Sequence, residues 1–284
     1  MPTPTPIWLV ANAASGSNSE AAVEALHSDL EANNFEVRRT IAFPDDALPN
    51  AGDLDAAGID MLAVFTGDGT VNALLTALYG WAGAVLVLPG GTMNLLSLRL
   101  HGKAEVGEIL SCVARNGARR VRPKVARCSA GDAFAGLLVG PGTCWSSVRE
   151  AMRTADVVGV LQGAAEAISQ TLDGPPVKLL DPPVGMDDGY PLMEITPTEL
   201  GLAASGFHAR TTTDMVSQSW ALMRRRFREG PHDRLGLFGQ MRLGAVDACN
   251  FPVLIDGEPQ ELASPANFAL VECEVDLLAI GSDG

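Results

Sequence analysis

Short apolar runs that end in small polar turns and lead into helical patterns dominate the first third of the chain. Residues 59–65 form one such run, which stops at Thr66-Gly67-Asp68-Gly69-Thr70. Leu74, Leu75 and Leu78 then recur at the spacing of one helix face. The pattern therefore predicts a buried strand, a glycine-containing turn and a helix.

The same order occurs twice more. Residues 7–11 are apolar and lead through the polar stretch 12–19 into a helical pattern that we expect Ser19 to cap. Residues 84–88 end in Pro89-Gly90-Gly91-Thr92-Met93-Asn94 before another helical run. Because ligands bind at the carboxyl ends of strands in an open parallel sheet, we expect the three turns to converge on one crevice.

The chemistry of these turns favours an anion. Glycines beside Asp68 let the backbone approach a ligand without a Cβ in the way, and the helix that follows offers unpaired N–H groups. Both features are typical of a phosphate site. The plain alternative is a strand-to-helix turn in which Thr70 or Asp68 caps the helix. Repetition of the turn after three successive strands is harder to explain in that way.

The pattern changes after residue 116. Charged and apolar residues alternate over 119–128, which predicts one half-exposed strand, and 133–139 predicts the next. Short strand-like runs then alternate with turns, which is typical of antiparallel β structure. These runs are 177–180, 190–196, 202–209, 240–246, 251–255 and 267–273, helical patterns cover 146–172 and 214–228, and a last apolar strand is predicted over 275–280.

Composition and charge narrow the class of protein. Of the 284 residues, 47% are hydrophobic and 5% aromatic, so the core must consist mainly of aliphatic side chains, as in parallel sheets covered on both faces. The formal net charge of −14 argues against nucleic-acid binding, which requires a basic surface. The five cysteines lack metal-ligand spacing, and the sequence shows neither a signal peptide nor a membrane span. We therefore expect a cytoplasmic protein.

Four motifs, taken in order, resemble the diacylglycerol kinase catalytic family, which includes bacterial lipid kinases and sphingosine and ceramide kinases. They are Asn12-x-x-Ser15-Gly16, Gly67-Asp68-Gly69-Thr70, Pro89-Gly90-Gly91-Thr92-x-Asn94 and Asp256-Gly257-Glu258. The resemblance implies an α/β fold with two domains. Residues 1–120 would form an open, mainly parallel nucleotide-binding sheet with a returning strand within 275–284. Residues 121–274 would form a β-rich, antiparallel, sandwich-like lipid-binding domain with inserted helices.

The resemblance also implies an ATP-dependent lipid kinase that uses Mg²⁺. It would transfer the γ-phosphate to the hydroxyl of a diacylglycerol-like or a sphingoid- or ceramide-like lipid, in a cleft between the domains. Backbone N–H groups of the turns would hold the phosphates, and Asp68 would face the magnesium–nucleotide complex as an essential carboxylate and metal ligand. The implied nucleotide-binding residues are Asn12, Ser15, Gly16, Thr66, Gly67, Gly69, Thr70, Gly91, Thr92 and Asn94.

Asp256 is the candidate general base. It follows the apolar run 251–255 in a tight turn, as the aspartate of the family's motif does, and phosphoryl transfer needs a carboxylate that accepts the proton of the attacking hydroxyl. Taken alone, Asp256-Gly257 more often indicates a plain hairpin turn. Glu258 would either support a structural cation, as its counterpart in the family does, or be a surface carboxylate.

The chain departs from the family at several positions. Leu95 stands where many bacterial members carry an aspartate that helps hold magnesium, and Ala73 replaces a frequent glutamate. A further acidic position of the family falls among Arg122, Pro123 and Lys124. With fewer carboxylates, magnesium would arrive mainly on ATP. Two alternatives stay open: a lipid- or nucleotide-binding protein with weak or no turnover, and a soluble-substrate kinase related to NAD kinases.

The expected partners are ATP and a lipid at a membrane surface. The helical segment 214–228 contains Trp220 and Phe227 beside a run of arginines, which would suit peripheral contact with the anionic inner face of a membrane. A solvated helix with its apolar side in the core explains the same pattern. A homodimer is also open.

Overall fold

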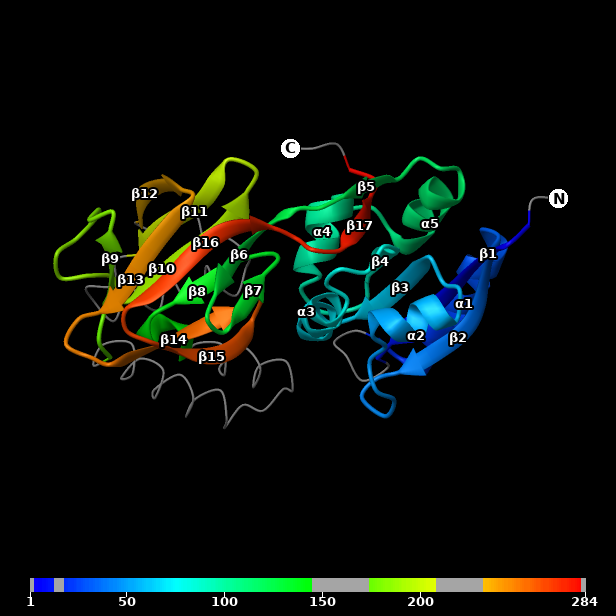
Figure 1. Cartoon of the computed structure of the whole chain (residues 1–284), viewed down its shortest axis with the longest axis horizontal. Coiled ribbons are helices and arrows are strands. Elements are labelled where there is room, and N and C mark those ends of the chain that lie inside the picture. Colours follow the sequence, from blue (N-terminus) through cyan, green and yellow to red (C-terminus); the bar gives the residue numbers. More distant parts are fainter. Residues whose placement is uncertain (1–2, 13–17, 145–173, 208–231, 282–284) are drawn as a thin grey trace. The chain divides into compact units, whose positions relative to one another are not determined.

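A computed structural model describes residues 3–12, 18–144, 174–207 and 232–281 of the chain (Figure 1). The chain forms two compact units, one of residues 1–123 and 272–284 and the other of residues 124–271. The first unit therefore contains both ends of the chain, and the second is inserted between its parts in sequence.

The first unit is built on a six-stranded sheet with the order β2-β1-β3-β4-β17-β5. Neighbouring strands are parallel from β2 to β17, and β5 is antiparallel to β17. Leu9, Val64 and Leu86 are fully buried, as expected for a sheet covered on both faces. The strands are β1 (Thr5–Ala11), β2 (Phe35–Ala42), β3 (Met61–Thr66), β4 (Ala84–Pro89), β5 (Arg119–Val121) and β17 (Asp276–Ala279).

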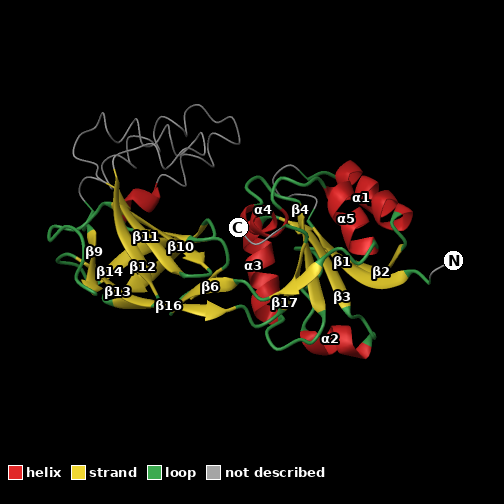
Figure 2. Ribbon diagram, turned by 90° about the horizontal axis from the view of Figure 1, so that it is seen from above, coloured by secondary structure: helices red, strands yellow, loops and turns green. Residues whose placement is uncertain are grey.

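Helices cover both faces of this sheet. Figure 2 shows α1 and α5 on one face and α2 on the other. Leu26 and Leu30 of α1 share a buried core with Ile109 and Leu110 of α5. Ser19 caps α1 as predicted, because its Oγ accepts the N–H of Ala22 at 3.2 Å. The helices are α1 (Glu20–Ala32), α2 (Ala51–Ala56), α3 (Asp68–Ala77), α4 (Leu95–His101) and α5 (Val106–Ala114).

The second unit consists of two sheets around one hydrophobic core. The sheets have the orders β12-β11-β10-β8-β14-β15 and β7-β6-β16-β13-β9. Phe251 of the first sheet and Phe268 of the second lie in the same core with Tyr190. The strands are β6 (Lys124–Cys128), β7 (Gly131–Ala133), β8 (Leu137–Val139), β9 (Val177–Asp181), β10 (Leu192–Thr198), β11 (Gly201–Phe207), β12 (His232–Phe238), β13 (Gln240–Ala245), β14 (Asn250–Ile255), β15 (Glu258–Ala263) and β16 (Ala266–Glu272). A short 3₁₀ helix, η1 (Pro141–Cys144), follows β8.

Two predicted strands are wrong in their extent. The single strand expected over 119–128 is divided at Pro123 into β5 and β6, which belong to different sheets. Proline lacks the N–H that a continuing ladder needs, and the boundary between the units, expected at 120/121, falls directly after it. The strand expected over 133–139 is divided into β7 and β8, because the N–H groups of 134–136 bind a side chain instead of a neighbouring strand.

The edge strands β12 and β15 were not predicted. β15 buries only Leu262 among its six residues, and its sequence carries a proline and two glutamates. Such a pattern has no apolar alternation from which a strand could be inferred. The helical patterns over 146–172 and 214–228 lie outside the described residues.

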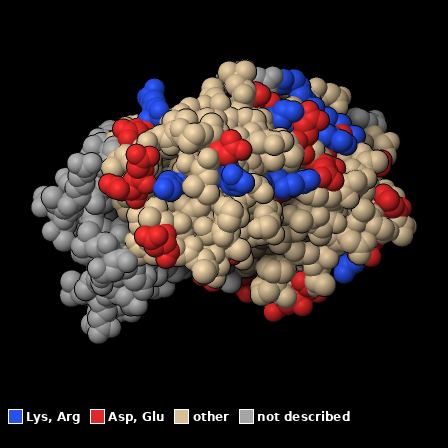
Figure 3. All heavy atoms as spheres, turned by 60° about the vertical axis from the view of Figure 1, so that its left-hand side comes forward, with Lys and Arg blue, Asp and Glu red and all other residues tan. Residues whose placement is uncertain are grey.

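The described surface mixes charges of both signs. On the face shown in Figure 3, Lys and Arg lie among Asp and Glu and form no continuous basic area. Within the described ranges, no helix has the length and apolar character needed to cross a bilayer.

Candidate functional site

The strands that lead into the three predicted glycine-bearing turns are neighbours in the first unit. Ala11 at the end of β1 pairs with Phe65 of β3, and Thr66 at the end of β3 pairs with Pro89 of β4. The strands are parallel, so the turns that follow them leave the sheet at the same edge. The carboxyl ends of β1, β3 and β4 therefore lie at one edge of the sheet, and the convergence of the three turns on one crevice stays a prediction.

The turns after β3 and β4 are in close backbone contact. A Cβ placed on Gly91 would lie 2.7 Å from the Cα of Gly67, and a Cβ on Gly90 would lie 2.5 Å from the carbonyl carbon of Phe65. Neither distance is tolerable for a side chain, so both positions require glycine. The Gly-Gly pair thus serves the packing of the two turns against each other.

Asp68 joins these turns through its side chain. It is the first residue of α3, and its Oδ1 accepts the N–H of Leu95, the first residue of α4, at 2.8 Å. The residue at the N-cap of α3 is Gly67, which has no side chain with which to cap that helix. Asp68 therefore caps the neighbouring helix, a contact that the plain alternative for the motif, in which Thr70 or Asp68 caps its own helix, does not include.

Asn94 shapes the turn that follows β4. It adopts a left-handed conformation with φ 51°, and its Oδ1 accepts the N–H of Gly91 at 2.6 Å. Thr66 is buried and donates its hydroxyl to the carbonyl of Gly67 at 3.2 Å. Thr92 is exposed on the same turn as Asn94. Side-chain contacts between these residues and a nucleotide remain predictions.

The turn after β1 is described only at its two ends. Asn12 donates its N–H to the carbonyl of Phe65 at 3.4 Å. At the other end of the turn, the Nδ2 of Asn18 donates to the carbonyls of Asn12 at 3.1 Å and Phe65 at 3.2 Å. The predicted residues Ser15 and Gly16 lie outside the described residues. Asn18 was not predicted, because nothing in the polar stretch 12–19 distinguishes its side chain from the others.

The far end of α4 is anchored by a buried imidazole. His101 is 4% exposed, its Nε2 lies 2.9 Å from the carbonyl oxygen of Val87 in β4, and its Nδ1 has no hydrogen-bond partner in the described structure. Burial lowers the pKa of His101 from its ordinary value of 6.5 to about 4. The imidazole is therefore neutral near pH 7, with Nε2 as the donor to β4.

Asp256 lies in the second unit, in the two-residue turn between β14 and β15. Ile255 pairs with Glu258, and both Asp256 and Gly257 have positive φ values, 49° and 95°. This geometry is that of a type I′ hairpin, for which Asp-Gly is a preferred sequence. The plain hairpin interpretation is therefore correct as far as the backbone is concerned.

Asp256 is only 7% exposed, and its carboxylate is held by three backbone donors. Its Oδ2 accepts the N–H of Phe134 at 2.8 Å, and its Oδ1 accepts those of Ala135 at 2.8 Å and Gly136 at 3.0 Å. An ordinary hairpin aspartate would point to solvent. Here the side chain is directed onto the loop between β7 and β8, and its orientation is fixed.

The carboxylates in the described part of the chain do not form a metal cage. No group of three or more His, Cys, Asp or Glu side chains is placed to hold an ion there. Glu258 is exposed at the start of β15. Magnesium in nucleotide sites is commonly bound through one or two carboxylates and the phosphates themselves, so Asp68 with a nucleotide fits this requirement.

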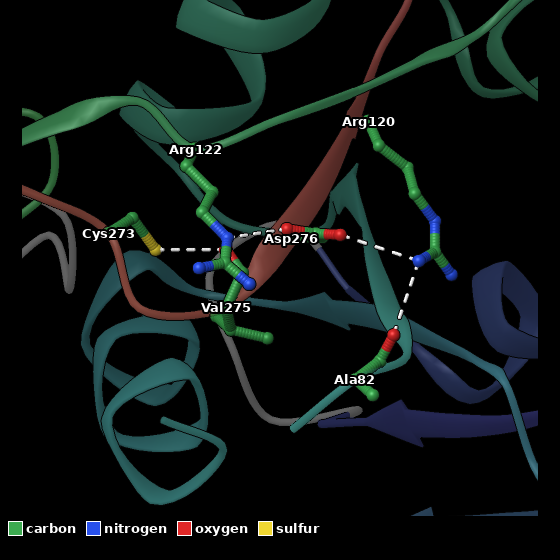
Figure 4. Close-up of polar contacts among 6 residues, drawn as sticks. All are labelled: Ala82, Arg120, Arg122, Cys273, Val275 and Asp276. Carbon is green, nitrogen blue, oxygen red and sulfur yellow. Dashed lines mark hydrogen bonds and ion pairs between the residues drawn. The ribbon is translucent and has the colours of Figure 1, made fainter. Parts of the chain in front are cut away.

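The segment around Arg122, where the family has an acidic residue, lies away from the three turns. Asp276 pairs with Ala84 at the amino end of β4, and the Nε of Arg122 lies 2.6 Å from its Oδ1 (Figure 4). Arg120 approaches the other oxygen of Asp276 at 3.4 Å and the carbonyl of Ala82 at 3.2 Å. The hydrogen bond with Asp276 raises the pKa of Arg122. This cluster belongs to the amino edge of the sheet, opposite the glycine turns.

A cavity of about 160 Å³ opens at the same amino edge. It is lined by Arg120 and by residues that begin the parallel strands, among them Thr5, Met61 and Ala84. The cavity therefore lies at the edge opposite the carboxyl ends of β1, β3 and β4.

Comparison with known proteins agrees with this architecture. Residues 6–125 match the family model described as the diacylglycerol kinase catalytic domain. A crystal structure described as a diacylglycerol kinase from Bacillus anthracis superposes with a TM-score of 0.62 at 15% identity, covering 98% of both chains. A second structure from the same organism gives a TM-score of 0.61 at 15% identity and the same coverage. These similarities show the fold. No curated protein matched the sequence.

Proposed function

We propose that this chain, which carries a diacylglycerol kinase catalytic domain at residues 6–125, is an ATP-dependent lipid kinase. It transfers the γ-phosphate of ATP to the hydroxyl of a diacylglycerol-like, sphingoid or ceramide-like lipid that it meets by peripheral contact with a membrane. The observation that carries this proposal is that three parallel strands end at one edge of the sheet, where Asp68 joins the turns that follow β3 and β4.

The first unit supplies the nucleotide half of the reaction. The turns after β3 and β4 lead directly into α3 and α4, and the first N–H groups of a helix, which have no partner within it, are suited to phosphate oxygens. In α4 the N–H of Leu95 is already bound by Asp68, so the phosphate would be held mainly at the start of α3. Gly91 keeps side-chain atoms out of the contact between these turns. Asp68 fixes α4 through Oδ1 and adds negative charge beside the turns, where it faces the magnesium–nucleotide complex.

Magnesium, when bound with ATP, neutralises phosphate charge. The residue that would hold it is Asp68, assisted by the phosphates themselves. Neither Leu95 nor Ala73 adds a carboxylate at this edge of the sheet.

The second unit supplies the proton acceptor. The lipid hydroxyl must lose its proton as it attacks phosphorus, and Asp256 accepts it. The three backbone N–H groups of 134–136 hold the carboxylate in one orientation, so little reorganisation is needed when the hydroxyl arrives. The isosteric Asp256→Asn change removes the proton acceptor while it preserves the side-chain shape.

The test is transfer of labelled γ-phosphate from ATP and magnesium to diacylglycerols, sphingoid bases and ceramides in mixed micelles. We expect wild type to phosphorylate one of these lipid classes and Asp256→Asn to lower kcat by about 10²-fold or more. Asp247→Asn is the matched control, because Asp247 is exposed and also has a left-handed conformation, with φ 57°. It should retain wild-type activity.

Loss of folding is separated from loss of chemistry in the same experiment. The side-chain amide of asparagine at position 256 would place an N–H donor opposite a backbone N–H donor, which could disturb folding. The Asp256→Asn and Asp247→Asn variants are therefore first compared by near-ultraviolet circular dichroism. A folded Asp256→Asn variant with undiminished kcat would refute the role of Asp256 as the base.

A second candidate function is a lipid- or nucleotide-binding protein without turnover. It is favoured by Leu95, which contributes a backbone N–H to Asp68 in place of a metal-binding carboxylate. Saturable ATP binding by calorimetry, without phosphate transfer to any lipid tested, would support it. Phosphorylated NAD in the same assay would instead support the NAD-kinase-like alternative.

A further inference from the structure

The side chain of Asn18 joins two strands at the edge where the turns meet. Its Nδ2 donates to the carbonyl oxygen of Asn12, which directly follows β1, and to that of Phe65 in β3. An amide nitrogen carries two hydrogens, and here each has a backbone acceptor. Asn18 is partly buried, and the two acceptors lie 6 and 47 positions away in the sequence.

The same residue fixes the start of a helix. Asn18 directly precedes Ser19, which caps α1 through its Oγ. The amino end of α1 is thereby tied to the carboxyl ends of β1 and β3. Asp68 ties α4 to the start of α3 in a comparable way, and Asn94 closes the turn before α4.

We propose that Asn18 is a positioning residue for nucleotide binding, because it holds the amino end of α1 against the end of β3, from which the chain turns to Asp68. The inference rests on the proposed function of this edge as the phosphate site. Asn18 need not touch the nucleotide. It acts through Asn12 and Phe65, whose carbonyls it holds together across two adjacent strands.

The chain offers a matched control at the opposite end of the same strand. The Nδ2 of Asn34 donates to the carbonyl of Thr3 at 3.3 Å, beside the start of β1. Asn18 and Asn34 therefore make the same kind of bond, an asparagine amide to a backbone carbonyl. They hold opposite edges of the sheet, and Asn34 is also exposed and has a left-handed conformation with φ 64°, so the stability of its variants is measured beside their ATP binding.

The test compares Asn18→Ala and Asn18→Asp with Asn34→Ala and Asn34→Asp. The Asn18→Ala variant should raise the KM for magnesium–ATP and its calorimetric Kd about tenfold, which corresponds to about 1.4 kcal/mol. It should leave kcat within about twofold, because the affected step is binding. Asn18→Asp should bind magnesium–ATP more weakly still, because it places a carboxylate against two carbonyl oxygens and adds negative charge. Both Asn34 variants should bind ATP like wild type.

Amide hydrogen exchange supplies a readout that needs no turnover. Both Asn18 variants should speed exchange at residues 12 and 65–68 and not at residues 3–7. Equal ATP affinity in Asn18→Ala and Asn34→Ala would overturn the inference even if wild type is an active kinase. If wild type binds ATP but phosphorylates no lipid, the proposed activity is refuted. The ATP affinities of the Asn18 and Asn34 variants would still decide the role of Asn18. Wild type that binds no ATP would overturn both.

Discussion

Asp68 has a structural bond and a proposed chemical role, and the two depend on different properties of its side chain. The bond to the Leu95 N–H needs an oxygen acceptor, whereas contact with a magnesium–nucleotide complex needs negative charge. Asparagine keeps the first property and loses the second. Alanine loses both.

We therefore expect Asp68→Asn and Asp68→Ala to separate stability from activity. Both should lose phosphate transfer by at least about 10²-fold, as for the loss of a key electrostatic contact. The alanine variant should also lose about 1 kcal/mol of unfolding free energy with its helix cap, while the asparagine variant stays near wild type. Urea unfolding and the lipid kinase assay measure the two effects. An active Asp68→Asn variant would restrict Asp68 to the capping role.

Candidate site residues could be proposed from the sequence, but the bonds that their side chains make could not. Asp68 and the Gly-Gly pair are found from short motifs, because few structural or functional roles require a glycine beside a carboxylate in a strand-to-helix turn. The partner of Asp68 lies 27 positions away, and those of Asp256 lie 120 to 122 positions away. Such contacts are set by strand order, which local patterns do not specify. Asn18 was missed for the same reason.

At the scale of elements, α4 is held at both ends by side chains. Asp68 binds its first N–H, and His101 in its last turn reaches back to Val87 of β4. The neutral imidazole makes this second anchor sensitive to acid. The pKa of His101 in the folded chain, about 4, lies below its ordinary value of 6.5. Between these values the unfolded chain binds a proton that the folded chain does not, so stability falls as the pH is lowered.

We expect the unfolding free energy of wild type to fall by about 2 kcal/mol more than that of His101→Gln between pH 7 and pH 5. Glutamine can donate to the Val87 carbonyl but does not titrate, and acidic groups common to both proteins cancel in the comparison. Urea titrations at the two pH values provide the measurement. Parallel pH dependence in the two proteins would show that His101 is not held neutral.

Elements with strong apolar periodicity were predicted well, and those defined by tertiary contacts were not. β4 and α4 occur where the sequence placed them, at Ala84–Pro89 and Leu95–His101. The interruption between β7 and β8 was missed, because the N–H groups of 134–136 have the Asp256 carboxylate as partner rather than a strand. An apolar run thus indicates a strand but does not show where its ladder stops.

At the scale of the whole chain, the first unit depends on a strand from the far end of the sequence. Leu277 of β17 is fully buried and pairs with Val85 of β4 on one side and Val121 of β5 on the other. Leu277→Ala should destabilise the first unit by about 2–5 kcal/mol. Amide exchange should then rise in β4 and β5 and remain unchanged in β10 and β11.

Leu262→Ala is the reciprocal control, because Leu262 is buried in β15 of the second unit. It should raise exchange in that unit and leave β4 protected. If either substitution raised amide exchange equally in both units, the two units would unfold together as one cooperative body.

The return of β17 also bears on how the chain is made. A ribosome releases β1 to β5 first, yet the place between β4 and β5 is filled only after residues 124–271 have been synthesised. Until then the apolar edge of β4 is an open template for pairing with other chains. The nascent first unit therefore stays incomplete until β17, which follows the inserted unit in the sequence, has been synthesised, and early folding of the inserted unit shortens that exposure.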